Sequence, residues 1–317
     1  MEKGQERSSP HILSKSAAVH CKLCGNSEGL WEIHYPGYVF RSGDFEAPPW
    51  FGHSKFYCPA CHFLWTDAFK NMDLVEYGKK YVENNYDHQR RPTESRMACA
   101  PYLLGKLVRL TGGRRFLDYG CGYNTTYLYE LRSRGFDVWG CDISAAVNYS
   151  RFVLQLPFEN FPDSFFDGIY SLDVMEHFSQ FGEDFKNISR ILKPGGYVLH
   201  NTISLDEYWK GDKEPPDDPM VWAPWHCSVF SERSAAMLAD KVGLIFEGTI
   251  RTRSDTGLAF LFHKSGPRLS SRFHMLHKAL RLFTLYRYTS YFQRHYVKAD
   301  KVAAIHGADA TAAKNGI

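Results

Sequence analysis

Two glycines and an aspartate are spaced to hold a ligand that carries a ribose. Asp118-Tyr119-Gly120-Cys121-Gly122 follows a short apolar run and precedes a segment with helical character. Gly120 and Gly122 permit backbone angles that side chains forbid and allow a ligand to approach the backbone. Asp142 follows Gly122 by 20 residues, a spacing at which an acidic residue accepts both ribose hydroxyl hydrogens. The alternative is a tight strand–helix turn with a surface aspartate.

Two Cys-x-x-Cys pairs are spaced to bind zinc through four thiolates. Cys21 and Cys24 form one pair, Cys58 and Cys61 the other, each on a short turn. The gap between the pairs exceeds that of a minimal zinc finger, but an intervening loop can protrude. Four cysteine ligands leave no open coordination position, so we expect a structural zinc. The alternatives are redox-active pairs or unrelated thiols.

Two histidines are candidates for removing a proton from an acceptor, because imidazole titrates near neutral pH. His177 ends the run Asp173-Val174-Met175-Glu176-His177. His226 ends Trp222-Ala223-Pro224-Trp225-His226, in which two tryptophans would wall an apolar acceptor site. The alternative for His226 is a surface loop whose aromatic rings pack on the core.

The elements that must position these residues alternate between strand and helix. Apolar runs predict strands at 115–119, 136–141, 167–172, 197–203, 243–250 and 257–263. Helices are predicted from Thr93 to about residue 110 and at 124–134, 181–192 and 232–242, with a tight turn at 193–196. The alternation indicates an α/β fold with a mostly parallel sheet and helices on both faces. Ligands bind beyond the carboxyl ends of such strands.

Four segments resemble the class I S-adenosylmethionine-dependent methyltransferases: Phe116–Gly122, Asp142–Ser144, Leu156–Phe158 with Phe166-Asp167, and Leu192–Gly196. The resemblance covers about residues 93–263 and implies a Rossmann-like, seven-stranded sheet that binds S-adenosylmethionine. It further implies that Asp118 orients the glycine loop and reaches the methionine part. Gly120 and Gly122 then face the cofactor, and Asp142 holds the ribose. We expect Ile143 and Asp173 to line the same site.

The chain departs from the family pattern in two places. Asn124 stands where the family usually has a third glycine, and asparagine tolerates left-handed geometry better than most residues. Only 11 residues separate Ser144 from Leu156, where family members usually fit a full helix and strand. The usual acidic partner of the adenine amine is also missing from 151–155. Gln155 and nearby backbone groups are our candidates for adenine contacts.

The zinc ribbon combined with this core resembles enzymes that methylate sugars, surface polysaccharides or secondary metabolites. We therefore expect methyl transfer to a small-molecule acceptor, with His226 and His177 as catalytic residues. Glu176 and His177 also match a Glu-His pair that many class I methyltransferases carry in a turn on the cofactor side. The spacing from Asp173 to His177 also resembles the metal-binding motif of ubiquinone-pathway O-methyltransferases. An RNA methyltransferase and a non-catalytic binding module that keeps the fold are the competing hypotheses.

The length of 317 residues suits one large and one small domain. We expect a flexible arm at 1–18, a zinc ribbon at 19–70, the methyltransferase domain at 71–263 and a basic aromatic tail at 264–317. The net charge of +3 is too small to predict a polyanionic partner for the whole molecule. The tail is rich in Lys and Arg, which suits a terminal helix, an RNA contact or an anionic membrane surface.

No run of 18 apolar residues and no signal peptide is visible, so we expect a cytoplasmic protein whose cysteines are thiols or metal ligands. The sequence does not predict the oligomeric state.

Overall fold

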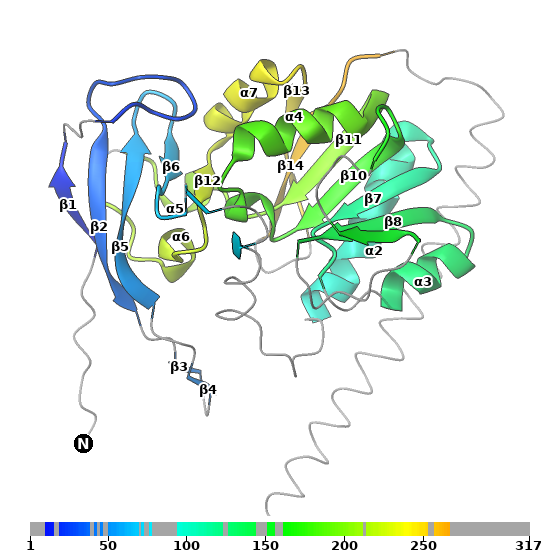
Figure 1. Cartoon of the computed structure of the whole chain (residues 1–317), viewed down its shortest axis with the longest axis horizontal. Helices are drawn as coiled ribbons and strands as arrows, with labels where there is room; N and C mark the ends of the chain where they lie inside the picture. Colours follow the sequence, from blue (N-terminus) through cyan, green and yellow to red (C-terminus); the bar gives the residue numbers. More distant parts are fainter. Residues whose placement is uncertain are drawn as a thin grey trace, which may run out of the picture.

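The protein contains two main sheets that lie side by side, shown in Figure 1. The computed structural model describes residues 10–15, 19–38, 41–42, 45–46, 50–69, 71–72, 76–77, 94–122, 126–143, 151–155, 161–211, 214–252 and 257–266. The predicted basic tail beyond residue 266, the first nine residues of the arm and Asn124 lie outside these ranges.

The larger sheet has seven strands. In spatial order they are β13 (Ile245–Arg251), β14 (Leu258–His263), β11 (Leu192–Asn201), β10 (Phe166–Leu172), β7 (Arg115–Tyr119), β8 (Asp137–Asp142) and β9 (Val153–Gln155). The pairs from β11 through β9 are all parallel, whereas β14 runs antiparallel to both of its neighbours. This arrangement confirms the predicted mostly parallel, seven-stranded sheet.

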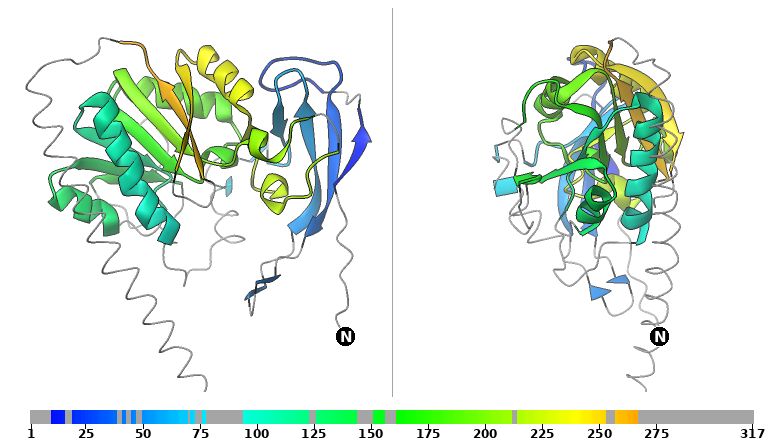
Figure 2. Two further views of the ribbon diagram at one scale, coloured as in Figure 1. Left: turned by 180° about the vertical axis from the view of Figure 1, so that it is seen from behind. Right: turned by 90° about the vertical axis from the view of Figure 1, so that its right-hand side faces the viewer.

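Helices cover both faces of this sheet because alternate strand residues point to opposite sides. Two core clusters follow this alternation: Leu117 packs with residues of α4 (Phe181–Ile191) and α7 (Glu232–Lys241), and Phe116 packs with residues of α2 (Glu94–Thr111) and α3 (Thr126–Ser133). Figure 2 shows α2 and α3 on the face opposite to α4 and α7. The four helices lie close to their predicted ranges.

The segment predicted as a tight turn at 193–196 is instead part of β11. The pairing with β10 shifts between Leu192 and Tyr197, so the extra residues form an irregularity inside the strand. Gly195 takes a φ of 81°, and its N–H donates to Lys264 O at 2.8 Å. Gly195 and Gly196 thus form a bulge within β11 and do not precede the strand.

The smaller sheet is antiparallel and lies at the N-terminal side. Its spatial order is β1 (His11–Ser14), β2 (Trp31–Tyr38), β5 (Trp50–Cys58), β6 (Phe63–Trp65) and β12 (Ser228–Phe230). Separately, β3 (Arg41–Ser42) pairs with β4 (Phe45–Glu46).

This sheet differs from the predicted boundaries at both of its edges. β1 lies inside the segment predicted as a flexible arm, where Ile12 pairs with Ile33 of β2. β12 comes from within the range predicted for the methyltransferase domain, yet Val229 pairs with Leu64 of β6. Long-range strand pairing fixes both segments, and a short strand carries little local signal of such pairing.

The two sheets share one hydrophobic core. The ring of Phe63 in β6 lies 5.1 Å from that of Phe181 in α4 and 4.7 Å from that of Phe230 in β12, measured between centroids. Side chains of the cysteine turns belong to the same buried cluster as Phe185 and Leu238. The connection after β11 contains α5 (Leu205–Tyr208) and α6 (Pro219–Trp222) and packs on the smaller sheet. No helix in the described residues is long and apolar enough to cross a membrane.

Candidate active site

The glycine loop lies at the carboxyl end of β7, between the ends of β10 and β8. Gly120 and Gly122 take φ angles of 71° and 69°, in the left-handed region that disfavours side chains. A Cβ at Gly120 would lie only 2.4 Å from Cγ2 of Val174. The loop therefore requires glycine at 120 both for its backbone angle and for its approach to the segment after β10.

Asp142 ends β8 directly beside this loop. Its Oδ2 accepts a hydrogen bond of 2.8 Å from the N–H of Gly122, and the side chain is buried. A carboxylate fixed next to bare glycine backbone suits a ligand with paired hydroxyls, so these residues fit the ribose of S-adenosylmethionine. Asp118 is fully buried and accepts a hydrogen bond from the hydroxyl of Tyr127 in α3.

The other predicted cofactor residues reach the same edge of the sheet. Ile143 follows Asp142 and packs against a cluster that contains Trp225. Asp173 follows β10 with a φ of 54°, and its N–H donates to Asn201 O. Gln155 pairs through its backbone with Asp142, which places the end of β9 beside the ribose candidate. The Gln155 side chain lies outside the described residues, as do 144–150.

The structure brings His177 and His226 together, although 48 residues lie between them in sequence. His177 ends the 3-10 helix η2 (Met175–His177), and His226 lies between α6 and β12. Their ring centroids are 4.9 Å apart, at an interplanar angle of 69°. The Nδ1 of His177 lies 2.8 Å from Trp225 O, and that of His226 lies 2.5 Å from Met220 O. Because a carbonyl only accepts, each Nδ1 carries the proton and each Nε2 carries a lone pair.

Both imidazoles are neutral at neutral pH. Burial lowers the pKa of His177 to about 4, and the positive charge of Lys55 adds to this effect. Burial also lowers the pKa of His226 well below its usual value, with further contributions from His177 and Lys55. Burial therefore keeps each ring in its uncharged form at neutral pH.

Glu176 is the third polar group at this point. It is 1% exposed, and its Oε2 accepts a hydrogen bond of 2.6 Å from the Thr202 hydroxyl. Burial raises the pKa of Glu176 to about 8, and the charge of Asp173 contributes to the rise. One ligand atom from each of Glu176, His177 and His226 lies within 4.8 Å of the others.

Lys55 holds the segment that carries His226, and sequence reasoning missed it. Its Nζ donates to Val221 O at 2.7 Å, to Ala223 O at 3.1 Å and to His226 O at 2.8 Å. The side chain is completely buried, and burial lowers its pKa to about 7. The available signal was the alternation of β5, in which Lys55 shares the buried face with His53 and Tyr57.

The two tryptophans of the predicted acceptor wall are covered by other rings. Trp222 stacks on Tyr35 at 5.9 Å, and Trp225 stacks on Phe69 at 4.6 Å. Both are buried, and Trp222 also donates through Nε1 to Pro216 O at 2.6 Å. The rings pack on the core, as the alternative interpretation has it, but residues 221–230 are all buried and form no surface loop. The two tryptophans anchor the chain on either side of Ala223 and Pro224.

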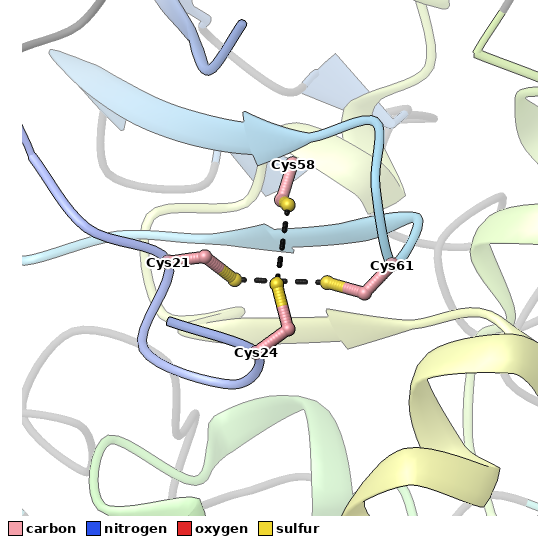
Figure 3. A group of neighbouring side chains, drawn as sticks. All are labelled: Cys21, Cys24, Cys58 and Cys61. Carbon is pink, nitrogen blue, oxygen red and sulfur yellow. Dashed lines mark hydrogen bonds between the residues drawn. The ribbon is translucent and has the colours of Figure 1, made fainter. Parts of the chain in front are cut away.

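The four predicted zinc ligands converge in the smaller domain. Figure 3 shows the sulfurs of Cys21, Cys24, Cys58 and Cys61 pointing toward one another from two separate turns. The Sγ atoms of Cys21 and Cys61 are 3.6 Å apart, as are those of Cys24 and Cys58. Zinc–sulfur bonds of about 2.3 Å in a tetrahedron place sulfurs about 3.8 Å apart, so the thiols fit a zinc ion. None of the eight cysteines, all within the described residues, forms a disulfide.

The cysteine turns also contact the larger domain directly. Ser231 caps α7 and forms a capping box with Ser234. The same two hydroxyls donate to backbone carbonyls of the second turn, Ser231 to Cys61 O at 3.5 Å and Ser234 to His62 O at 3.3 Å. The start of α7 is thus hydrogen-bonded to the metal turn.

Comparison with known proteins assigns the chain to a family. A family model described as a methyltransferase domain matches residues 86–246, half of the chain. The chain belongs to the methyltransferase-domain family. Its fold is the class I, Rossmann-like fold of S-adenosylmethionine-dependent methyltransferases, which confirms the predicted family.

Several characterised proteins match parts of this domain. Phosphoethanolamine N-methyltransferase 3 of Arabidopsis thaliana is 32% identical over 131 residues, which cover 37% of this chain and 25% of that protein. A ubiquinone biosynthesis O-methyltransferase of Alkalilimnicola ehrlichii is 31% identical over 106 residues, or 29% of this chain and 42% of that protein. The chain thus spans about a quarter of the first relative's length.

Among solved structures, the Burkholderia thailandensis 1,6-didemethyltoxoflavin-N1-methyltransferase covers 72% of this chain and 99% of its own. It is 15% identical, with a TM-score of 0.45. The family assignment rests on the sequence match.

Proposed function

We propose that the protein transfers a methyl group from S-adenosylmethionine to a small-molecule acceptor, with a sugar or secondary-metabolite hydroxyl as the first candidate. The observation that carries this proposal is the pair of imidazoles beside the cofactor loop. Val174, which touches Gly120, lies three residues before His177. The relatives include a phosphoethanolamine N-methyltransferase and a ubiquinone biosynthesis O-methyltransferase. Their names support a small-molecule acceptor.

In this proposal the bound cofactor supplies a methyl group already activated by its positively charged sulfur. Gly120, Gly122 and Asp142 bind and orient it, with Asp118, Ile143, Gln155 and Asp173 around it. What remains for the protein is to position the acceptor and to take up its proton. The Nε2 atoms of His226 and His177 are the candidates for this acceptor-side role, since both carry lone pairs.

Two measurements test the proposal. Calorimetry with S-adenosylmethionine on the zinc-loaded protein should show binding at one site. A transfer assay with labelled cofactor against a metabolite extract, followed by mass analysis, should yield a methylated small molecule. Binding without transfer to any acceptor would favour the non-catalytic binding module, and transfer only to added RNA would favour the RNA methyltransferase.

The variant His226→Asn sharpens the assay. Its amide keeps a donor for Met220 O but has no counterpart of the Nε2 lone pair. We expect cofactor affinity to stay within twofold of wild type, while transfer falls by about a hundredfold, the usual worth of a positioned acid–base group. Transfer at the wild-type rate would remove His226 from the acceptor side.

We further propose a cytoplasmic location, supported by eight cysteines without a disulfide among them. We also propose that the thiol cluster binds structural zinc, because its spacing fits the ion and leaves no open position.

A further inference from the structure

We propose that the amino ends of the parallel strands in the larger sheet form a basic edge, through which the protein attaches to an anionic lipid surface. The basic edge consists of four exposed arginines: Arg109, Arg114, Arg134 and Arg151. It lies opposite the carboxyl ends of the strands, which carry the glycine loop and Asp142. The proposal goes beyond the proposed function and does not depend on it, because lipid binding needs neither cofactor nor acceptor.

Three connections of the fold bring these arginines to one edge. Arg109 lies in the last turn of α2, and Arg114 lies between α2 and β7. Arg134 comes just before β8, and Arg151 just before β9. Because β7, β8 and β9 pair in parallel, their first residues meet at the same edge of the sheet. Neighbouring strands are about 4.8 Å apart, so the three strand starts span about 10 Å.

The carboxylates near these strand starts are already paired with other cations. The ion pairs are Asp137 with Arg115 and Arg132, Asp167 with Lys193, and Asp163 with Arg190. Among the described residues, the guanidinium groups of Arg109, Arg114 and Arg151 take part in no such pair. Glu130 lies one helical turn before Arg134 and offsets part of its charge. The other three arginines therefore carry most of the uncompensated charge.

Two exposed acidic residues lie farther along the same edge. They are Asp240, in the last turn of α7, and Glu247, in β13. In the order of the sheet, β13 is four strands away from β7. At about 4.8 Å per strand this separation is about 20 Å, whereas the Debye length in physiological salt is about 8 Å. These carboxylates therefore do not cancel the charge of the arginines beside β7, β8 and β9.

The basic C-terminal segment of the chain starts from the same edge. Because β14 runs antiparallel to β11, its end lies beside the start of that strand, where the Lys264 N–H donates to Gly196 O at 3.0 Å. Figure 1 shows the chain after β14, in orange, on the side of the larger sheet away from the smaller sheet. Residues 267–298, which lie outside the described residues, contain seven Lys or Arg and no Asp or Glu. The sequence that follows the basic edge thus adds further cations to it.

Apolar residues among these cations favour a lipid surface over RNA. Leu110, next to Arg109, is 41% exposed. In the sequence after residue 266, apolar side chains recur at helical spacing between the basic residues: Phe273, Leu276, Leu280 and Phe283. Leucine and phenylalanine interleaved with Lys and Arg are typical of segments that lie in the membrane interface. RNA is bound through cations and stacking aromatic rings, which leaves the leucines without a role.

The position of the basic edge also determines which way the cofactor side faces. The five residues of β7 separate its first residue from the glycine loop by about 17 Å. A protein attached through the amino ends of its strands therefore directs the carboxyl ends toward water. We expect the affinity for S-adenosylmethionine to be the same with and without vesicles.

Sedimentation with lipid vesicles measures the attachment directly. The full chain is mixed with vesicles of phosphatidylcholine alone and with vesicles that also contain phosphatidylserine, at low and at physiological salt. We expect binding to the vesicles that contain phosphatidylserine and not to those of phosphatidylcholine alone. Binding should weaken as the salt concentration rises, because salt screens the attraction between the arginines and the lipid headgroups.

A double variant tests the basic edge itself. Arg114→Gln with Arg151→Gln removes two unpaired charges, and each cation near an anionic lipid surface is worth about fivefold in affinity, so binding should weaken about thirtyfold. Lys210→Gln with Arg233→Gln is the matched control, since it removes two exposed charges after β11 and at the start of α7, on the carboxyl side of the sheet. The control should bind vesicles as tightly as wild type.

Circular dichroism checks that each variant is folded. If the double variant does not fold, Arg151→Gln alone decides the question, with an expected loss of about fivefold.

The outcomes separate this proposal from the proposed function. Equal binding to the two kinds of vesicle, binding to neither, or equal weakening in the two double variants overturns the basic edge as a lipid-binding surface. Binding of added RNA without binding to phosphatidylserine vesicles also overturns it and assigns the edge to nucleic acid. None of these readouts involves methyl transfer, so vesicle binding as expected without any transfer overturns only the proposed function.

Discussion

The N–H of Gly122 holds Asp142 in place by donating a hydrogen bond to its carboxylate. The hydrogen bond ties the end of β8 to the loop after β7, so the two parts of the cofactor site are set by one contact. A preformed carboxylate loses little conformational freedom when a ribose binds. At the scale of single residues, one hydrogen bond therefore sets the position of the ribose candidate relative to the glycine loop.

Replacement of Asp142 by alanine should weaken S-adenosylmethionine binding by about tenfold to a hundredfold, since hydrogen bonds to a charged group are worth about 1.5–3 kcal/mol. Calorimetry measures the change. Asp137→Ala, at the other end of β8, serves as the control and should leave the affinity unaltered. An Asp142→Ala variant that binds as tightly as wild type would contradict the ribose assignment.

Gly120→Ala should abolish cofactor binding and lower stability by about 1–3 kcal/mol, because the residue would sit at a φ of 71° with its methyl against Val174. The double variant with Val174→Ala removes the clash but leaves the backbone strain. We therefore expect it to recover part of the stability lost, as measured by urea unfolding. If the double variant recovers no stability, backbone strain at residue 120 alone accounts for the loss.

His200 should make the protein less stable in mild acid. It is fully buried in β11, its Nδ1 lies 2.6 Å from the Ser171 hydroxyl, and burial lowers its pKa to about 3. In the unfolded chain it takes up a proton near pH 6.5, whereas in the folded protein it stays neutral. The unfolded state thus binds more protons below pH 6.5, and stability falls as the pH falls toward 3, by up to about 1.4 kcal/mol per pH unit.

Urea unfolding at pH 7, 6 and 5 checks this, with His200→Gln as the comparison. The variant starts from a lower stability but should lose less of it between pH 7 and 5. Parallel curves for wild type and variant would rule out His200 as a source of the acid sensitivity.

At the scale of elements, the segment from α6 to the start of β12 depends on the smaller domain. Lys55 of β5 binds three of its carbonyls, Tyr35 covers Trp222, and β6 pairs with β12 at its end. The histidine that this segment carries is therefore positioned by residues that precede the methyltransferase domain. Lys55 acts as a positioning residue, since it reaches His226 only through the backbone.

Lys55→Met should lower stability by about 1–3 kcal/mol, because three buried carbonyls lose their donor. It should also reduce kcat while cofactor affinity is retained, which a purely structural role distant from the site would not do. Lys22→Met removes an ion pair with Asp67 at the surface and should cost less than about 1 kcal/mol. Equal losses in the two variants would contradict the positioning role.

The sequence predicted those elements whose own residues show an apolar run or a motif at the expected spacing. β7 and β10 read as apolar runs because they are buried on both faces, and Gly120, Gly122 and Asp142 fall at their expected places. The pairing of β12 with β6 and the meeting of His177 with His226 were not predictable, since both arise from tertiary contacts between distant segments. The buried position of Lys55 in β5 was likewise not predictable, because an isolated lysine is normally exposed.

On the scale of the whole molecule, the cysteine turns and the methyltransferase domain should unfold together. Removal of zinc should therefore affect more than residues 19–70, since β12 and the capping box of α7 contact the metal turns. Metal binding in such sites contributes on the order of 10 kcal/mol. We expect a strong chelator to shift the single thermal unfolding transition of the intact protein to a lower temperature.

Cys58→Ser provides the matched variant, with Cys99→Ser as the control outside the cluster. The first should lose zinc and its tertiary tryptophan signals, and the second should keep both. A zinc-free protein with an intact methyltransferase domain that still methylates its acceptor would show that the two parts are independent.

The pairing of β12 with β6 also determines when the smaller sheet can be completed during synthesis of the chain. While the ribosome is still translating residues 70–227, the ribbon has its thiols but not its last strand, so the backbone edge of β6 and the ring of Phe63 stay uncovered. An unpaired edge of this kind invites pairing with other chains. Only after residue 230 has left the exit tunnel can the ribbon close. A chaperone or early zinc uptake would matter most in that interval, and a fragment that ends before β12 should aggregate when it is expressed alone.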